Sequence, residues 1–162
     1  MGAQSLGHFI VAAGLALVAL NAFAEFTGKV VAIADGDTLT VLLDKRQVKV
    51  RLLEIDAPEK AQAFGDRSRQ SLSYLCFGKA VKVDDKGKDR YGRTLAQVTC
   101  DGIDANAEQV RQGMAWVYRK YALKDSPLYA VEHEAKQASR GLWADAEPVP
   151  PWEWRAKRSR TN

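Results

Sequence analysis

Short runs of alternating hydrophobic and polar residues fill the chain between residues 26 and 100. Val, Ile, Leu and Thr dominate these runs and polar turns separate them, which is typical of β-strands. The pattern predicts five strands, at residues 26–34, 38–43, 47–55, 80–84 and 94–100. Short strands joined by tight turns favour an antiparallel meander that curls into a small barrel.

Hydrophobic residues at helical spacing predict three helices, at residues 66–77, 104–114 and 127–140. Asp66 and Asp104 can cap the first two helices, and Ser126 followed by proline is a strong start for the third. The first helix falls between the third and fourth strands, which is the element order of the OB fold. We therefore predict an α+β fold, a five-stranded antiparallel OB-fold β-barrel with three α-helices.

A proline-rich stretch, with Pro148, Pro150 and Pro151, follows the last predicted helix. Because proline lacks an N–H and restricts the residue before it, we expect this stretch to be an extended segment packed on the barrel. The motif from Trp152 to Arg155 is assigned to packing. The basic residues after it are expected to form a mobile tail that adds non-specific affinity for nucleic acid.

The first 24 residues carry no Lys, Arg, Asp or Glu, and Phe9 to Leu20 is an apolar run of signal-peptide length. Ala22 and Ala24 give the small-x-small pattern of a cleavage site. We predict a signal peptide at 1–24, a domain at 25–146 and a Pro/Trp segment with a basic tail at 147–162. The protein would then be exported, periplasmic or extracellular, without a stable membrane anchor. A short uncleaved anchor stays open, since no Lys or Arg precedes the apolar run.

Cysteine and histidine are scarce. Cys76 and Cys100 could form one disulfide in an oxidising compartment, or remain two buried free thiols. No Cys/His spacing fits zinc, and removal of residues 1–24 would leave His133 as the one histidine. This composition argues against hydrolases that depend on histidine pairs or on a Ser-His-Asp triad.

Charged residues gather at two predicted strand ends. Asp35-Gly36-Asp37 forms a tight-turn motif before the second strand, and Arg51, Asp56 and Glu59 surround the end of the third. If these ends converge, Asp37 and Asp56 make a hard oxygen site suited to Ca²⁺, and Arg51 can bind a phosphate bidentately. An ordinary turn and a structural salt bridge would explain the same residues.

A third motif, Asp89-Arg90-Tyr91-Gly92-Arg93, follows in a predicted turn between two strands. With it, the sequence from about Val30 to Trp143 resembles the staphylococcal nuclease (thermonuclease) family. Four segments carry the resemblance, in the order and at the spacing of the family. They are residues 34–38, 50–59, 89–96 and 110–115.

The resemblance implies a five-stranded OB barrel with three helices and Ca²⁺-dependent phosphodiesterase activity on DNA and RNA that leaves 3′-phosphates. Asp37 and Asp56 match the two calcium carboxylates, and Glu59 matches the glutamate assigned to activate water. Arg51 and Arg93 match the arginines that hold the scissile phosphate.

Two tyrosines, Tyr91 and Tyr118, fall near positions that line the nucleotide pocket of the family. Ala57 stands where the family has a threonine that binds calcium through its main-chain carbonyl, so the change should spare the metal. The loop after Glu59 is shorter than in the staphylococcal enzyme, and that enzyme lacks the two cysteines.

The leading prediction is thus an exported calcium-dependent nuclease, acting as a monomer. The main alternative is a non-catalytic nucleic-acid-binding OB-fold module, and a third is a cell-surface interaction protein. The formal net charge of +4 favours polyanionic partners without distinguishing these classes. Binding relatives usually lose the carboxylates or arginines of the site, whereas this chain keeps all five.

Overall fold

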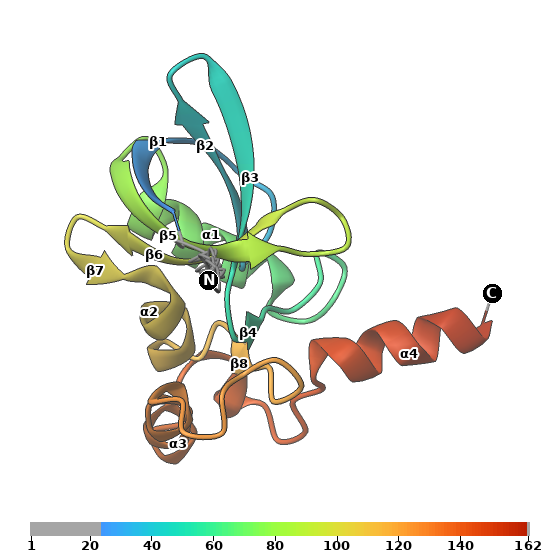
Figure 1. Ribbon diagram of the computed structural model, residues 1–162. Coiled ribbons are helices and arrows are strands. Elements are labelled where there is room, and N and C mark those ends of the chain that lie inside the picture. The colour runs from blue at the N-terminus through green and yellow to red at the C-terminus, as the bar shows by residue number, and fades with distance from the viewer. Residues whose placement is uncertain (1–23, 162) are drawn as a thin grey trace, which may run out of the picture.

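The computed structural model describes residues 24–161, and five of its strands form a closed barrel (Figure 1). These strands are β1 (Glu25–Ile33), β2 (Thr38–Leu43), β3 (Arg46–Leu52), β5 (Ala80–Lys88) and β6 (Thr94–Cys100). Three further strands have two residues each: β4 (Ile55–Asp56), β7 (Ile103–Asp104) and β8 (Trp116–Val117). The α+β OB-fold prediction is confirmed, and the strand bounds agree with the pattern to within a few residues.

The barrel is not wholly antiparallel, as the sequence analysis had predicted. Its strand order is β3-β2-β1-β5-β6, and β3 also pairs with β6 in parallel, with Val50 opposite Thr94. The reason is geometric. Antiparallel neighbours must alternate in direction around a ring, so an odd number of strands leaves one parallel pair.

The prediction of three α-helices was also too low. The described residues form four, together with the 3-10 helix η1 (Gly141–Ala144). They are α1 (Gly65–Cys76), α2 (Ala105–Arg111), α3 (Leu128–Gln137) and α4 (Pro151–Thr161). The unexpected helix is α4, which replaces much of the expected extended segment and mobile tail. Pro151 is its first residue, the position at which a missing N–H and a fixed φ favour a helix.

The caps of the first two helices differ from each other. Asp104 caps α2 as predicted, since its side chain accepts a hydrogen bond from the Ala107 amide at 3.1 Å. Asp66 does not cap α1. That helix begins at Gly65, after Phe64 in the left-handed region at φ 66°. Gly65 fits there because a Cβ would collide with the carbonyl oxygen of Glu59.

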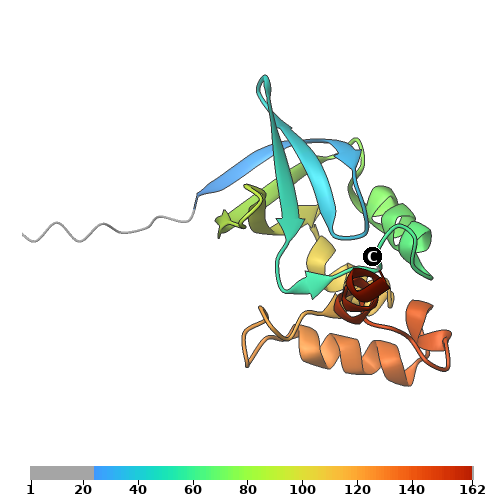
Figure 2. The ribbon, with the colours of Figure 1, turned by 90° about the vertical axis from the view of Figure 1, so that its right-hand side faces the viewer.

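The helices lie beside and below the barrel (Figures 1 and 2), with α2 and α3 gathered at one end. The core is built from inward-facing barrel residues such as Val30, Leu39 and Val50. A disulfide joins Cys76, at the end of α1, to Cys100, at the end of β6, with an S–S distance of 2.04 Å. It ties a helix to the barrel wall that the helix covers.

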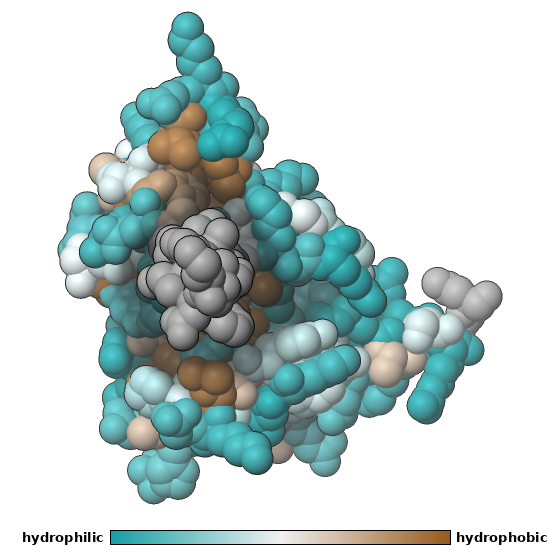
Figure 3. Space-filling model, viewed as in Figure 1, coloured by the Kyte–Doolittle hydropathy of each residue, from teal (hydrophilic) through white to brown (hydrophobic). Residues whose placement is uncertain are grey.

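The surface around this core is largely hydrophilic, and Figure 3 shows α4 as a mostly hydrophilic arm. None of the helices within residues 24–161 has both the length and the apolar character needed to cross a membrane. The predicted signal peptide lies outside the described residues except for Ala24.

Candidate active site

The turn before β2 places a buried carboxylate at one mouth of the barrel. Asp37, 4% exposed, follows Asp35 and Gly36, and its amide donates to the Asp35 carboxylate at 3.1 Å. Only glycine fits the middle position, because a Cβ there would lie 2.8 Å from the Cβ of Ala57 and against the Ser68 side chain. The turn is therefore packed tightly against the β4 region and α1.

A second buried carboxylate comes from β4. Strand β3 ends at Leu52, and Glu54 then adopts a left-handed conformation at φ 65°, which reverses the chain into β4. Asp56 lies on β4 opposite Trp116 of β8 and is 2% exposed. The Ala57 amide donates to the Asp37 Oδ2 atom at 2.7 Å, so a hydrogen bond links the two carboxylate-bearing segments.

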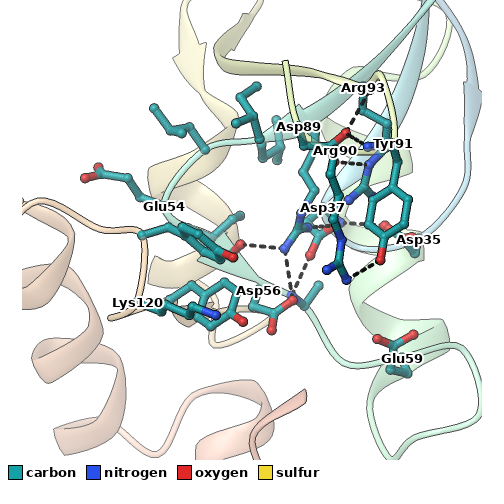
Figure 4. Close-up of a pocket in the computed structure, with 18 of the residues that line it drawn as sticks. Asp35, Asp37, Glu54, Asp56, Glu59, Asp89, Arg90, Tyr91, Arg93 and Lys120 are labelled. Carbon is teal, nitrogen blue, oxygen red and sulfur yellow. Dashed lines mark hydrogen bonds and ion pairs between the residues drawn. The ribbon is translucent and has the colours of Figure 1, made fainter. Parts of the chain in front are cut away.

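Arg51 bridges these two carboxylates. Its guanidinium forms an ion pair with Asp37, and its Nη2 atom donates to Asp56 Oδ1 at 3.0 Å and to the Ile55 carbonyl at 3.1 Å. Strand register explains the position, since Arg51 pairs with Thr38 across β2 and β3, one residue after Asp37. Figure 4 shows Asp37 and Asp56 converging on this part of the pocket.

Burial and charge set the protonation of these groups. Burial alone would raise the pKa of Asp37, but the Arg51 guanidinium and the Ala57 amide outweigh it, so this pKa lies below its ordinary value. Burial and the neighbouring Asp37 charge raise the pKa of Asp35 to about 7. Burial also raises the pKa of Asp56, despite its hydrogen bond from Arg155. Asp37 is thus the carboxylate most strongly held in its ionised form.

The hairpin between β5 and β6 brings a second arginine to the same mouth. Asp89 accepts hydrogen bonds from the amides of Tyr91 and Arg93, both at 2.9 Å, and from Arg93 Nε at 2.7 Å. The Arg93 Nη1 atom reaches Thr38 Oγ1 at 3.3 Å, beside Asp37. Tyr91 is 68% exposed, and the guanidiniums of Arg90 and Arg93 lie over its ring.

Glu59 and an aromatic cluster complete the opposite side. Glu59 follows β4 in a loop, with a side chain that is 40% exposed and accepts from Arg155 Nη1 at 2.7 Å. The ring of Tyr118 stacks on Trp152 with 5.3 Å between centroids and meets Tyr121 edge-on at 4.9 Å. Figure 4 shows Glu59 on the far side of Asp56 from Glu54 and Lys120.

All eight residues that the sequence singled out for the site line one cavity of about 820 Å³. They are Asp37, Arg51, Asp56, Ala57, Glu59, Tyr91, Arg93 and Tyr118. Segments up to 81 residues apart in the chain therefore converge as the strand-end argument predicted. The cavity is highly charged, with six acidic and six basic side chains in its lining.

The oxygen donors at the centre suit a hard divalent cation. Asp37 and Asp56 supply carboxylate oxygens from two rigid segments, and calcium accepts such ligands together with main-chain carbonyls. As the side chains stand, Arg51 and Arg155 are bonded to these oxygens, and residues 24–161 hold no group of three or more His, Cys, Asp or Glu side chains arranged for a metal. The donor chemistry fits calcium, and a bound ion would compete with the arginines.

Sequence reasoning missed three residues of this region. Arg155 had been assigned to packing, yet it donates to both Asp56 and Glu59. Gln109, fully buried on α2, donates to the Gly36 carbonyl at 2.7 Å and so supports the turn that carries Asp37. Glu54 accepts from the Leu123 amide at 2.7 Å and fixes the loop after Tyr118. A glutamine at a core position of α2 was the one signal available, since buried polar groups need partners.

An OB barrel that carries buried carboxylates and arginines at one mouth defines the chain as an OB-fold protein with a site for an anionic ligand. The sequence model described as "Staphylococcal nuclease homologue" matches residues 49–145. The chain belongs to this family.

Similar curated proteins agree with this assignment. The chain is 46% identical to "Protein ParB" of Escherichia coli, over 96% of this chain and 94% of that protein. It is 43% identical to "Micrococcal nuclease" of Shigella flexneri, with 94% of each chain covered. It is 51% identical to an "Uncharacterized endonuclease" of Haemophilus influenzae, over 80% of this chain and 72% of that protein.

Proposed function

We propose that this protein is an exported, calcium-dependent nuclease that hydrolyses phosphodiester bonds of DNA and RNA and leaves 3′-phosphate ends. The observation that carries the proposal is the arrangement of Arg51 between two buried carboxylates, with Arg93 in the same cavity. A structural salt bridge needs no second arginine and no open cavity beside it. The family assignment and the relatives named nucleases support the same conclusion.

The two arginines bind the scissile phosphate in this proposal. A guanidinium can donate two parallel hydrogen bonds to phosphate oxygens, and its charge stabilises the extra negative charge that develops during attack. Arg51 is held in place by Asp37 and Asp56, and Arg93 by Asp89, so both are oriented before substrate arrives. Oriented donors require little reorganisation when the reaction occurs.

Asp37, Asp56 and the main-chain carbonyl of Ala57 would hold the calcium ion. The bound ion would neutralise charge on the phosphate and help to position water. With few protein ligands, we expect a dissociation constant of about 10⁻⁴ to 10⁻³ M.

Glu59 accepts a proton from the attacking water, or orients that water, in the proposed reaction. Its side chain is 40% exposed at the cavity edge, where water has access, and no histidine is needed for this step. The water oxygen forms a bond to phosphorus while the bond from phosphorus to the 5′ oxygen breaks. The 5′ oxygen then takes up a proton, and the phosphate stays on the 3′ side. Tyr91 and Tyr118 would contact the nucleotide beside this phosphate.

Export is part of the same proposal. Strand β1 begins at Glu25, so removal of residues 1–24 would leave every barrel strand whole. The Cys76–Cys100 disulfide suits an oxidising compartment. Cell fractionation and N-terminal sequencing should find the protein outside the cytosol, beginning at Glu25. A cytosolic protein that retains residues 1–24 would contradict export.

The activity is tested with the chain from Glu25 to Asn162 and single-stranded DNA, in millimolar calcium and in excess chelator. Cleavage in calcium alone, with 3′-phosphate ends, is expected. Glu59→Gln should reduce kcat by at least ~100-fold, as loss of a general base typically does. Glu134→Gln, which makes the same change on an exposed residue of α3, should cleave like the wild type.

Binding without cleavage would instead favour the nucleic-acid-binding module. In that case the chelator and Glu59→Gln should leave the affinity for DNA nearly unchanged. Cleavage that persists in excess chelator would reject the role of calcium while keeping the nuclease class.

A further inference from the structure

A residue from the far end of the chain lies on the carboxylates of the site. Arg155 of α4 donates from Nη2 to Asp56 Oδ2 at 2.7 Å and from Nη1 to Asp56 Oδ1 at 3.3 Å. The same Nη1 atom donates to Glu59 Oε1 at 2.7 Å. One guanidinium thus engages both carboxylates, which lie 99 and 96 residues earlier in the sequence.

These contacts use the oxygens that a cation would need. Both carboxylate oxygens of Asp56 accept from Arg155, and Oδ1 also accepts from Arg51. The Asp56 side chain is only 3% exposed, so it cannot turn outward to find other partners. A divalent ion and the Arg155 fork therefore compete for the same two oxygen atoms, and their positive charges repel each other.

Arg155 is the partner that is free to leave. Its side chain is 42% exposed, whereas Asp56 is fixed on β4. Helix α4 projects away from the barrel (Figure 1), and the residues from Ala156 to Arg160 are all exposed. The base of the helix is held by a hydrogen bond from Gln62 to the Val149 carbonyl at 2.6 Å and by the stacking of Trp152 on Tyr118.

We propose that α4 is an autoinhibitory element, in which Arg155 occupies the carboxylates of Asp56 and Glu59 and must be displaced before calcium binds. This inference rests on the proposed function, because it assigns these carboxylates to the metal and to water activation. The buried Asp56 charge needs a positive partner when no metal is present, and Arg155 supplies one. The enzyme is then inactive until calcium reaches the level needed to displace the helix.

The test measures calcium binding directly by isothermal titration, without substrate. Arg155→Gln should bind calcium at least ~10-fold more tightly than the wild type, the factor that one charge-assisted hydrogen bond contributes. Arg158→Gln is the matched control, because it removes the same charge from an exposed residue of the same helix. It should change the calcium dissociation constant by less than about 2-fold, as expected for a screened exposed charge.

Hydrogen exchange on the wild-type protein provides a second readout that needs no variant. Saturating calcium should speed exchange of the α4 amides after Trp152, while the barrel amides stay unchanged or become slower. Unchanged α4 protection, or an Arg155→Gln protein that binds calcium no more tightly than wild type, would overturn the inference.

The two proposals fail in different ways. If the wild type cleaves DNA only with calcium but Arg155→Gln binds calcium equally, the autoinhibitory role is wrong and the nuclease stands. If Arg155→Gln binds calcium more tightly but no variant cleaves, the competition stands and the nuclease assignment fails. If neither protein binds calcium, both are wrong.

Discussion

The carboxylate of Asp89 holds Arg93 through both its main chain and its side chain. One oxygen accepts the Arg93 amide at 2.9 Å, and the other accepts Arg93 Nε at 2.7 Å. The hairpin thereby fixes an arginine that would otherwise move with an exposed turn. In the proposed nuclease, Asp89 is a positioning residue for the phosphate-binding arginine.

Replacing Asp89 with Asn should therefore lower catalytic efficiency without unfolding the protein. Loss of a charge-assisted hydrogen bond to Arg93 should reduce kcat/KM by roughly 10- to 100-fold. Asp101→Asn, a matched change in a surface turn, should have little effect because Asp101 pairs only with Lys79 at the surface.

A double-mutant cycle separates positioning from a general structural effect. If Asp89 acts through Arg93, Asp89→Asn should cost little further activity in an Arg93→Ala background. Additive losses in the two variants would show that Asp89 works through some other contact.

The same pair should respond to acid. Burial would raise the pKa of Asp89, but the hydrogen bonds from Arg93 and from the Tyr91 amide outweigh it, so this pKa lies below the ordinary 3.8. The contribution of Asp89 to stability is then present above about pH 3.8 and is lost as the pH falls through its folded-state pKa. An NMR titration of the Asp89 carboxyl carbon should give a midpoint below 3.8, and a midpoint above it would contradict the assignment.

Sequence pattern gave the barrel and the primary site for an identifiable reason. Strand alternation and turn residues are local, and Asp37, Arg51 and Asp56 lie at strand ends that the fold must bring together. Arg155 could not be found in this way. Its contact depends on a helix that starts at a proline, where the pattern favoured extended chain, and on a span of 99 residues. The parallel closure of the barrel was missed for a different reason, since it follows from counting strands around a ring.

Gln109 offers a test of how the Asp37 turn is supported. It is fully buried, donates to the carbonyls of Gly36 at 2.7 Å and Ser68 at 3.1 Å, and accepts from Ser71 at 2.6 Å. Gln109→Met keeps the volume but leaves these groups without their partner. Unfolding free energy should fall by about 1–3 kcal/mol, the cost of unsatisfied buried polar groups.

Calcium affinity should fall in the same Gln109→Met variant, because the turn that carries Asp37 loses its hydrogen bond at Gly36. Gln112→Met is the control, since Gln112 is exposed one turn along and bonds only to Glu108. Its stability should stay within about 0.5 kcal/mol of the wild type. Equal stability of the Gln109 and Gln112 variants would show that the buried amide does not support the turn.

The Cys76–Cys100 disulfide should account for a measurable share of stability. It closes a loop across a sequence separation of 24, for which the chain-entropy estimate is about 3 kcal/mol. For a domain of this size that corresponds to a loss of roughly 10 °C in melting temperature on reduction. The double variant Cys76→Ser/Cys100→Ser should melt near the reduced wild type and should not respond to reductant. Because both cysteines are fully buried, reduction is carried out in denaturant before refolding. If reduced and oxidised wild-type proteins melt together, the disulfide does not stabilise the fold, and the oxidising compartment inferred from it loses its support.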